Sequence, residues 1–121
     1  MERMEMEKLS LVVPCYNEEE SIPLFFAAVE KIRTALTNTT IEYIFVNDGS
    51  RDHTLTVLRE MAKDYPDSIR YLSFSRNFGK EAALYAGLEH ATGDYVAVMD
   101  VDLQDPPELL PQMLHLIRDE S

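Results

Sequence analysis

Residues 95–108 have the sequence YVAVMDVDLQDPPE, and the rest of the chain can be interpreted outward from this stretch. Its first five residues are apolar, which predicts a short strand that is buried on both faces. Asp100, Asp102 and Gln104 follow at alternate positions. Because alternate residues of an extended chain point to the same side, these three side chains can present their oxygen atoms together. The two prolines that come next cannot extend a central strand, so the chain turns there.

Two carboxylates and an amide are hard oxygen ligands, which suit Mg²⁺ or Mn²⁺ better than Zn²⁺. A D-x-D pair also arises by chance, so spacing alone supports a metal site and a plain acidic loop equally. Position favours the metal, because ligands of open parallel α/β sheets bind beyond the carboxyl ends of the strands. Neighbouring carboxylates also repel each other unless a cation joins them. We therefore expect a Mg²⁺ or Mn²⁺ site at Asp100, Asp102 and Gln104.

Strand-like and helix-like patterns alternate along the whole chain. Strands are predicted at residues 9–13, 41–46, 69–74 and 95–99, and helices at 21–36, 52–65, 81–91 and from near 105–108 to 118. Ser21 and Asp52 can act as N-caps of the first two helices. This alternation predicts an α/β fold, a Rossmann-like parallel sheet with strand order 3-2-1-4. The loops that follow the strands then lie along one edge of the sheet and can form one site.

The composition is that of one globular domain with an acidic surface. Of 121 residues, 45% are hydrophobic, and 22 acidic against 11 basic residues give a formal charge of −11. This argues against non-specific nucleic-acid binding, which needs a basic surface. Cys15 is the single cysteine, which excludes an internal disulfide. No apolar run approaches the ~20 residues that span a bilayer, so we expect a soluble chain without a transmembrane segment.

Three side chains in the first two strand-end loops are suited to a nucleoside. Tyr16 can stack on a flat ring, and Glu18 and Asp48 can accept hydrogen bonds from a base or a ribose. The plainer alternatives are that Glu18 interacts with a helix dipole and that Asp48 belongs to an ordinary turn. Both alternatives remain open at the level of the sequence.

The loop after the third strand carries two cations. Arg76 and Lys80 flank Gly79 just before a predicted helix N-terminus, which is a suitable place for an anionic phosphate. The alternative is a solvated basic pair. Other chemistries fit poorly, because the chain lacks the G-x-x-x-x-G-K-[ST], G-x-G-x-x-G and G-x-S-x-G motifs. A base-sized ring, acidic acceptors, two cations and a metal site together indicate a pocket for a metal-bound nucleoside diphosphate.

Four motifs, in order, resemble those of family 2 glycosyltransferases with the GT-A fold. They are VPCYNEE at 13–19, NDGSRD at 47–52, SRNFGK at 75–80 and DVDLQDPPE at 100–108. The likeness extends from Leu9 to Arg118. Within the family it points to the polyprenyl-phosphate branch, which includes dolichol-phosphate mannose synthases and bactoprenol glucosyltransferases. One departure is Asn47, where the family often has Asp.

The resemblance implies specific roles for the predicted site residues. It assigns the nucleotide to Pro14, Tyr16, Glu18, Asp48, Gly49, Arg76, Lys80 and Asp100, and the metal to Asp100, Asp102 and Gln104. Of these, Arg76 and Lys80 would lie near the diphosphate or the acceptor phosphate. The implied reaction is transfer of a sugar from a UDP- or GDP-sugar to a polyprenyl or dolichyl phosphate. It would take place at the cytoplasmic face of a membrane, in the assembly of the cell envelope.

Family members have a longer catalytic domain, often followed by membrane helices. The resemblance therefore implies an N-terminal extension at 1–8 and the nucleotide-sugar-binding half of a GT-A fold at 9–121. The acceptor half and the catalytic base are expected beyond Ser121, so we expect no sugar transfer by this chain alone. The alternative is a non-catalytic metal- or nucleotide-binding module. A phospho-acceptor receiver domain fits less well, because it would carry its acidic pair after the first strand.

The same comparison predicts an exposed sheet edge. In the family's fold, further strands pair beside the strand at 95–99, and they are missing here. This strand carries no Lys, Pro or bulge signal that would discourage pairing with another chain. We therefore expect self-association through this edge.

Overall fold

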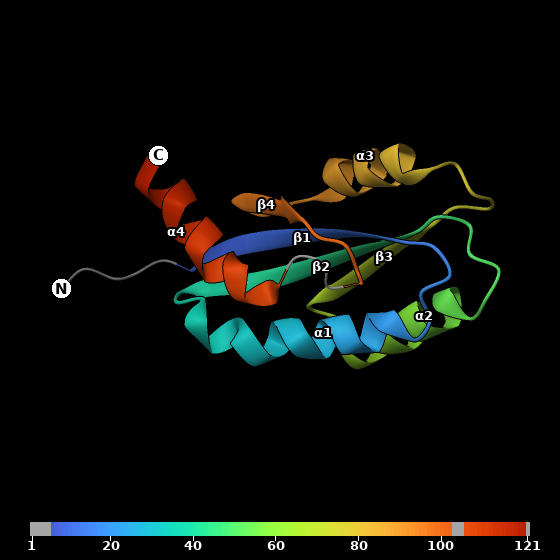
Figure 1. The fold of residues 1–121 in the computed structure, drawn as a ribbon, viewed down its shortest axis with the longest axis horizontal. Coiled ribbons are helices and arrows are strands. Elements are labelled where there is room, and N and C mark those ends of the chain that lie inside the picture. The colour runs from blue at the N-terminus through green and yellow to red at the C-terminus, as the bar shows by residue number, and fades with distance from the viewer. Residues whose placement is uncertain (1–5, 103–105, 121) are drawn as a thin grey trace.

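The computed structural model describes residues 6–102 and 106–120. Its elements are β1 (Glu7–Cys15), α1 (Ser21–Ile32), η1 (Arg33–Ala35), β2 (Thr39–Asn47), α2 (Thr54–Asp64), β3 (Ile69–Ser73), α3 (Lys80–His90), β4 (Tyr95–Val98), η2 (Pro107–Leu109) and α4 (Leu110–Glu120). The four strands are parallel and form one sheet in the order β3-β2-β1-β4. Helices α1 and α2 cover one face of the sheet, and α3 covers the other (Figure 1). The predicted α/β fold and strand order are confirmed.

Strand β1 lies at the centre of the sheet and of the core. It pairs with β2 along its whole length and with β4 from Leu9 to Val12. Its side chains alternate between two apolar layers: Leu11 and Val13 pack on the side of α1, and Val12 faces α3. Helix α3 approaches the sheet closely at Gly87, where a Cβ atom would lie 2.4 Å from Cγ1 of Val12. This packing on both faces fixes the position of the carboxyl end of β1.

The expectation that residues 95–99 are buried on both faces is wrong. Ala97 and Met99 are buried, but Val96 and Val98 are 39% and 42% exposed. The reason is that β4 is the outer strand, while α3 packs over β1 and β2. When no helix covers one face of a strand, apolar residues on that face stay exposed.

The first strand also extends further than its sequence predicts. A strand was expected to stop before Pro14, but β1 continues through it to Cys15. Proline is tolerated there because β4 pairs with β1 only as far as Val12, so Pro14 has a paired strand on one side only. This extension carries the end of β1 into the functional edge of the sheet.

Neither predicted cap occupies the N-cap position of its helix. Ser21 is the first residue of α1 rather than its N-cap, which is Glu20, and no side chain caps this helix. The N-cap of α2 is His53, again without a side-chain capping bond. Asp52 lies one residue earlier and accepts a hydrogen bond from the Thr54 backbone N–H at 2.9 Å. None of the helices within the described ranges is both long enough and apolar enough to span a bilayer.

A buried carboxylate joins the strands on the amino-terminal side of the sheet. Glu42 of β2 is 7% exposed and accepts hydrogen bonds from the Ser10 hydroxyl at 2.6 Å and the Arg70 guanidinium at 3.0 Å. The Thr92 backbone N–H and hydroxyl also donate to it, at 3.1 and 3.0 Å. Burial by itself raises the pKa of Glu42, but these hydrogen bonds together lower it to about 2. The Glu42 carboxylate therefore ties β1, β2, β3 and the segment before β4 together.

Candidate functional site

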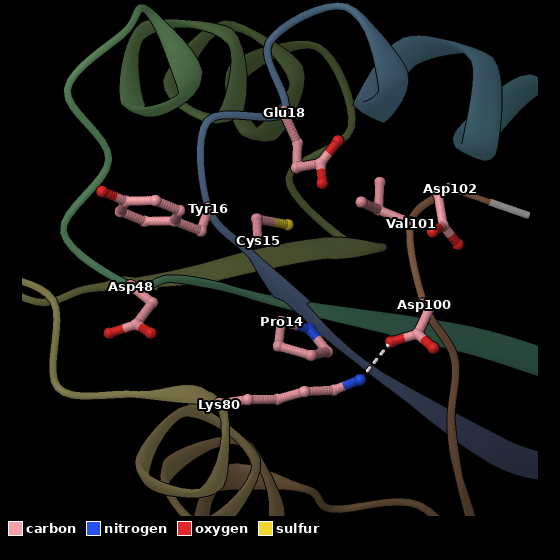
Figure 2. A pocket seen from close by; sticks show the side chains of 9 residues that line it. All are labelled: Pro14, Cys15, Tyr16, Glu18, Asp48, Lys80, Asp100, Val101 and Asp102. Atoms are coloured by element: carbon pink, nitrogen blue, oxygen red, sulfur yellow. Dashed lines mark hydrogen bonds and ion pairs between the residues drawn. The ribbon is translucent and has the colours of Figure 1, made fainter.

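The carboxyl ends of β1, β2 and β4 and the start of α3 surround a pocket of about 320 Å³ (Figure 2). It is lined by Pro14, Cys15, Tyr16, Glu18, Asp48, Lys80, Asp100, Val101 and Asp102. The sequence predicts all of these except Cys15 and Val101. Among the residues that the structure describes, the predicted Gly49 and Arg76 do not line the pocket. Gln104, the third predicted metal ligand, lies outside the described residues.

A buried valine separates the two acidic residues that follow β4. Val101 is 3% exposed and belongs to the apolar core. Asp100 and Asp102 are more exposed, and all three residues line the pocket. Residues 101 and 102 lie in a turn rather than in the extended chain that the sequence predicts, but both carboxylates still reach the pocket.

Lys80 links the start of α3 to the end of β4. Its Nζ lies 2.8 Å from Oδ1 of Asp100, and Figure 2 shows the lysine side chain extended along the pocket toward this carboxylate. The side chains of Lys80 and Asp100 are 61% and 33% exposed, so the ion pair is open to solvent and to ligands. In the same view, Tyr16 and Asp48 lie at the opposite end of the pocket from Asp100 and Asp102.

The first two strand-end loops are joined by hydrogen bonds. The backbone N–H of Asn17 donates to the Ser50 hydroxyl at 2.9 Å, and the Arg51 N–H donates to Oδ1 of Asn17 at 2.8 Å. The Glu18 N–H donates to the Thr54 hydroxyl at 2.9 Å. Asn17 has a φ of 53°, a left-handed conformation that asparagine tolerates better than most residues. These contacts set the positions of Tyr16 and Glu18.

The sequence alone does not indicate roles for Asn17, Ser50 or Thr54. The signal is indirect: Asn and Ser are typical of turns that use side-chain hydrogen bonds, and Ser50 follows Gly49. The partners of such bonds come from a different loop, and a single sequence does not reveal them. These residues do not line the pocket, but their hydrogen bonds connect the two loops that carry Tyr16, Glu18 and Asp48.

Asp48 faces the loop after β3. It is 4% exposed, and its Oδ1 accepts a hydrogen bond from the Phe78 backbone N–H at 2.7 Å. Its Oδ2 accepts from the Gly79 N–H at 3.1 Å and from the Asn77 side-chain amide at 3.2 Å. The carboxylate thus connects the second strand-end loop to the third, while remaining part of the pocket wall.

Arg76 lies outside the pocket lining. Its guanidinium carbon is 4.6 Å from the centre of the Phe78 ring, in a cation–π arrangement. Phe78 is 51% exposed and also meets Phe74 edge-on, with ring centres 5.6 Å apart. The sequence gives Arg76 and Lys80 as a pair, but the structure places only Lys80 in the pocket.

Cys15 forms part of the pocket wall without offering a reactive thiol. It is 2% exposed. Burial, and then the charge of Glu18, raise the pKa of the thiol far above its usual range. Cys15 therefore fills space at the end of β1 rather than acting as a nucleophile.

The carboxylates after β4 have the chemistry that a small divalent cation requires. Mg²⁺ is usually held by one or two carboxylates together with phosphate oxygens of a ligand. Asp100 and Asp102 supply that number, and Lys80 offsets part of their repulsion. Two carboxylates therefore fit a cation that is shared with a phosphate-bearing ligand. Within residues 6–102 and 106–120, no group of three or more His, Cys, Asp or Glu side chains is placed to hold a metal.

Comparisons with known proteins agree with this geometry. A protein-family model described as Glycosyl transferase family 2 matches residues 10–121. The chain is 50% identical over 107 residues to the prophage bactoprenol glucosyl transferase homolog of Escherichia coli (strain K12) and to the bactoprenol glucosyl transferase of Shigella phage SfX. Each match covers 88% of this chain but 34% of the relative, so the chain spans about a third of the length of these curated relatives.

A solved structure has the same arrangement of elements. The mannosyltransferase PcManGT from Pyrobaculum calidifontis, in complex with GDP-Man and Mn²⁺, is 26% identical, with a TM-score of 0.75. The match covers 90% of this chain and 32% of the mannosyltransferase. The family inferred from the four motifs is confirmed: the chain belongs to glycosyl transferase family 2.

Proposed function

We propose that this chain forms the sugar-donor site of a glycosyltransferase. A protein that contains it would transfer a sugar from a UDP- or GDP-sugar to a polyprenyl-type lipid phosphate. The observation that carries the proposal is the pocket, in which an aromatic ring, acidic side chains, a lysine and two strand-end carboxylates face one space (Figure 2). The names of the relatives at 50% identity support the lipid acceptor. The ligands of the mannosyltransferase at 26% identity support the nucleotide sugar and the metal.

The nucleoside is assigned to the end of the pocket formed by β1 and β2. Tyr16, which is 43% exposed, offers a ring on which a base can stack, and Pro14 lies beside it in the wall. Glu18 and Asp48 offer acceptors for the base or the ribose. Gly49 contributes through the shape of the turn, since it does not line the pocket.

The diphosphate is assigned to the end formed by α3 and the segment after β4. Sugar transfer leaves negative charge on the departing nucleoside diphosphate, and Lys80 is placed to balance part of that charge. Arg76 lies in the same strand-end loop and would have to leave the Phe78 ring to reach the phosphates or an acceptor. Asp100, Asp102 and Gln104 are the proposed metal ligands. When bound there, Mg²⁺ or Mn²⁺ supplies positive charge to the phosphate oxygens.

No residue of this chain is assigned as the catalytic base. A lipid-phosphate acceptor resides in a membrane, so we place the whole protein at the cytoplasmic membrane face, in cell-envelope assembly. These statements concern a protein that contains the chain and extend the donor-site proposal.

Nucleotide binding should depend on the metal. In calorimetric titrations with UDP and GDP, we expect weak binding in Mn²⁺ or Mg²⁺ and none in EDTA, because phosphates and carboxylates repel each other without a cation. Asp102→Asn should weaken metal-dependent binding at least about tenfold. Asp67→Asn removes the same charge in the exposed turn before β3 and serves as the matched control. Equal affinity in EDTA, or normal binding by Asp102→Asn, would overturn the assignment.

We also propose that the outer edge of β4 mediates self-association. Within the described ranges β4 is an outer strand of the sheet, and two of its own residues, Val96 and Val98, are exposed. Light scattering across a concentration series should show a dimer, and Val98→Lys should weaken it by placing a charge on this edge. Leu24→Lys, at a 66% exposed site on α1, is the control that should leave the dimer intact. A monomer at all concentrations would contradict the proposal.

A further inference from the structure

Asp48 forms its hydrogen bonds with the loop that follows β3. The carboxylate of this 4% exposed residue accepts hydrogen bonds from two consecutive backbone N–H groups, those of Phe78 and Gly79. The Asn77 side-chain amide donates both to Oδ2 and to the main-chain oxygen of Asp48, each at 3.2 Å. Hydrogen bonds to an ionised acceptor are stronger than neutral ones, and burial strengthens them further. Asp48 therefore binds the third strand-end loop firmly.

The same loop is held from a second direction by close packing. A Cβ atom on Gly49 would lie 2.1 Å from the carbonyl carbon of Arg76 and 2.3 Å from the nitrogen of Asn77. Only glycine permits this approach of two backbones. The turn at Asp48 and Gly49 and the loop at residues 76–79 consequently form one unit.

Lys80, the lysine assigned to the diphosphate, directly follows this unit in the chain. Gly79 precedes α3, and Lys80 is the first residue of that helix. The Lys80 ammonium reaches Asp100 at 2.8 Å, across the pocket from the nucleoside end (Figure 2). A displacement of the backbone at Phe78 and Gly79 would therefore be passed directly to Lys80.

We infer that Asp48 is a positioning residue for the diphosphate end of the site, which it serves by holding the backbone of the loop that carries Lys80. This inference rests on the proposed function, because it assigns the diphosphate to Lys80. It is compatible with a contact between Asp48 and the base. What it adds is that loss of the Asp48 carboxylate weakens binding of a ligand that has no base at all.

Inorganic pyrophosphate is such a ligand. In Mn²⁺-containing buffer, Asp48→Asn should weaken pyrophosphate binding about tenfold or more. Asparagine keeps one acceptor oxygen, but an NH₂ group that can only donate replaces Oδ2, which accepts from the Gly79 N–H and the Asn77 side-chain amide. Tyr16→Ala should weaken UDP or GDP binding and leave pyrophosphate binding unchanged, which shows that the titration separates the two ends of the pocket. If Asp48→Asn weakens only the nucleotide and not pyrophosphate, the inference is wrong.

The matched control is Glu42→Gln. Glu42 is also a buried carboxylate that accepts a backbone N–H, but it lies on the amino-terminal side of the sheet. Both variants lose the same kind of interaction, and circular dichroism should show that both remain folded. Glu42→Gln should bind pyrophosphate as the wild type does. A similar loss of pyrophosphate binding in both variants would mean that general destabilisation, rather than positioning, is responsible.

Hydrogen exchange provides a readout that needs no ligand. The Phe78 and Gly79 amides should exchange slowly in the wild type and in Glu42→Gln, and fast in Asp48→Asn relative to amides elsewhere in the sheet. Unchanged exchange at these two amides would overturn the inference. If the wild type binds neither nucleotide nor pyrophosphate, the proposed function fails, while the exchange data still decide whether Asp48 holds the loop.

Discussion

Gly49→Ala should lower the free energy of unfolding by about 3–4 kcal/mol, well beyond the effect of a typical single substitution. Gly49 has a φ of 67°, a conformation that L-residues with a side chain rarely adopt. The added methyl group would also overlap backbone atoms of Arg76 and Asn77, which cannot rotate away as a side chain can. The loop would have to move, and the hydrogen bonds to Asp48 would be lost with it. Urea denaturation of the two proteins measures the difference.

Gly79→Ala distinguishes the effect of backbone strain at a positive φ from the effect of steric overlap with another loop. Gly79 has a φ of 104°, but a Cβ atom there would have no neighbour within 4 Å. This variant suffers only backbone strain, for which roughly 1–3 kcal/mol is expected, because a φ of 104° with a ψ of 158° is a conformation nearly restricted to glycine. Equal losses in the two variants would contradict the claim that contact between the loops makes Gly49 necessary.

Acid should destabilise the protein through Glu42 in particular. The pKa of this carboxyl is about 2 in the folded protein, against 4.5 for an unperturbed glutamate. Because the folded-state pKa is the lower one, the stabilisation is complete above about pH 4.5 and is lost as the pH falls toward 2. The difference corresponds to about 3 kcal/mol. Urea midpoints measured at pH 7, 4.5 and 2.5 should show this loss.

Glu42→Gln should remove most of that pH dependence. Glutamine has the same shape but no charge, so it cannot form the ion pair with Arg70 or accept as strongly from Ser10. The variant should be less stable than the wild type at pH 7 and approach it in stability near pH 2. Parallel stability curves for the two proteins would show that Glu42 is not the group responsible.

The sheet and most of the pocket lining could be predicted from the sequence, because both depend on local patterns. Apolar runs that alternate with helical patterns determine a parallel sheet, and polar residues at strand ends then meet at one edge. The burial of residues 95–99 could not be predicted in the same way. Val96 and Val98 have the composition of core residues, and only the position of α3 over β1 and β2 explains their exposure.

The roles of individual polar residues depend on contacts between loops. The sequence shows that Asp48 lies in a turn, but not that Phe78 and Gly79 donate to it across 30 residues of chain. Likewise, the spacing of Arg76 and Lys80 suggests two equivalent cations. In the structure the Arg76 guanidinium lies over the Phe78 ring, whereas Lys80 lines the pocket. This difference depends on the direction of the side chains rather than on their spacing in the sequence.

The central place of β1 has a consequence for how the chain folds during its synthesis. Leu9 pairs with Tyr95, so β1 acquires its second neighbour only after 86 further residues have been added. At the usual rate of translation this takes roughly 4–17 s. During that time a central strand of the sheet has one open edge, and parallel pairing between distant segments is slow to form. We therefore expect nascent chains that have not yet reached β4 to be prone to aggregation.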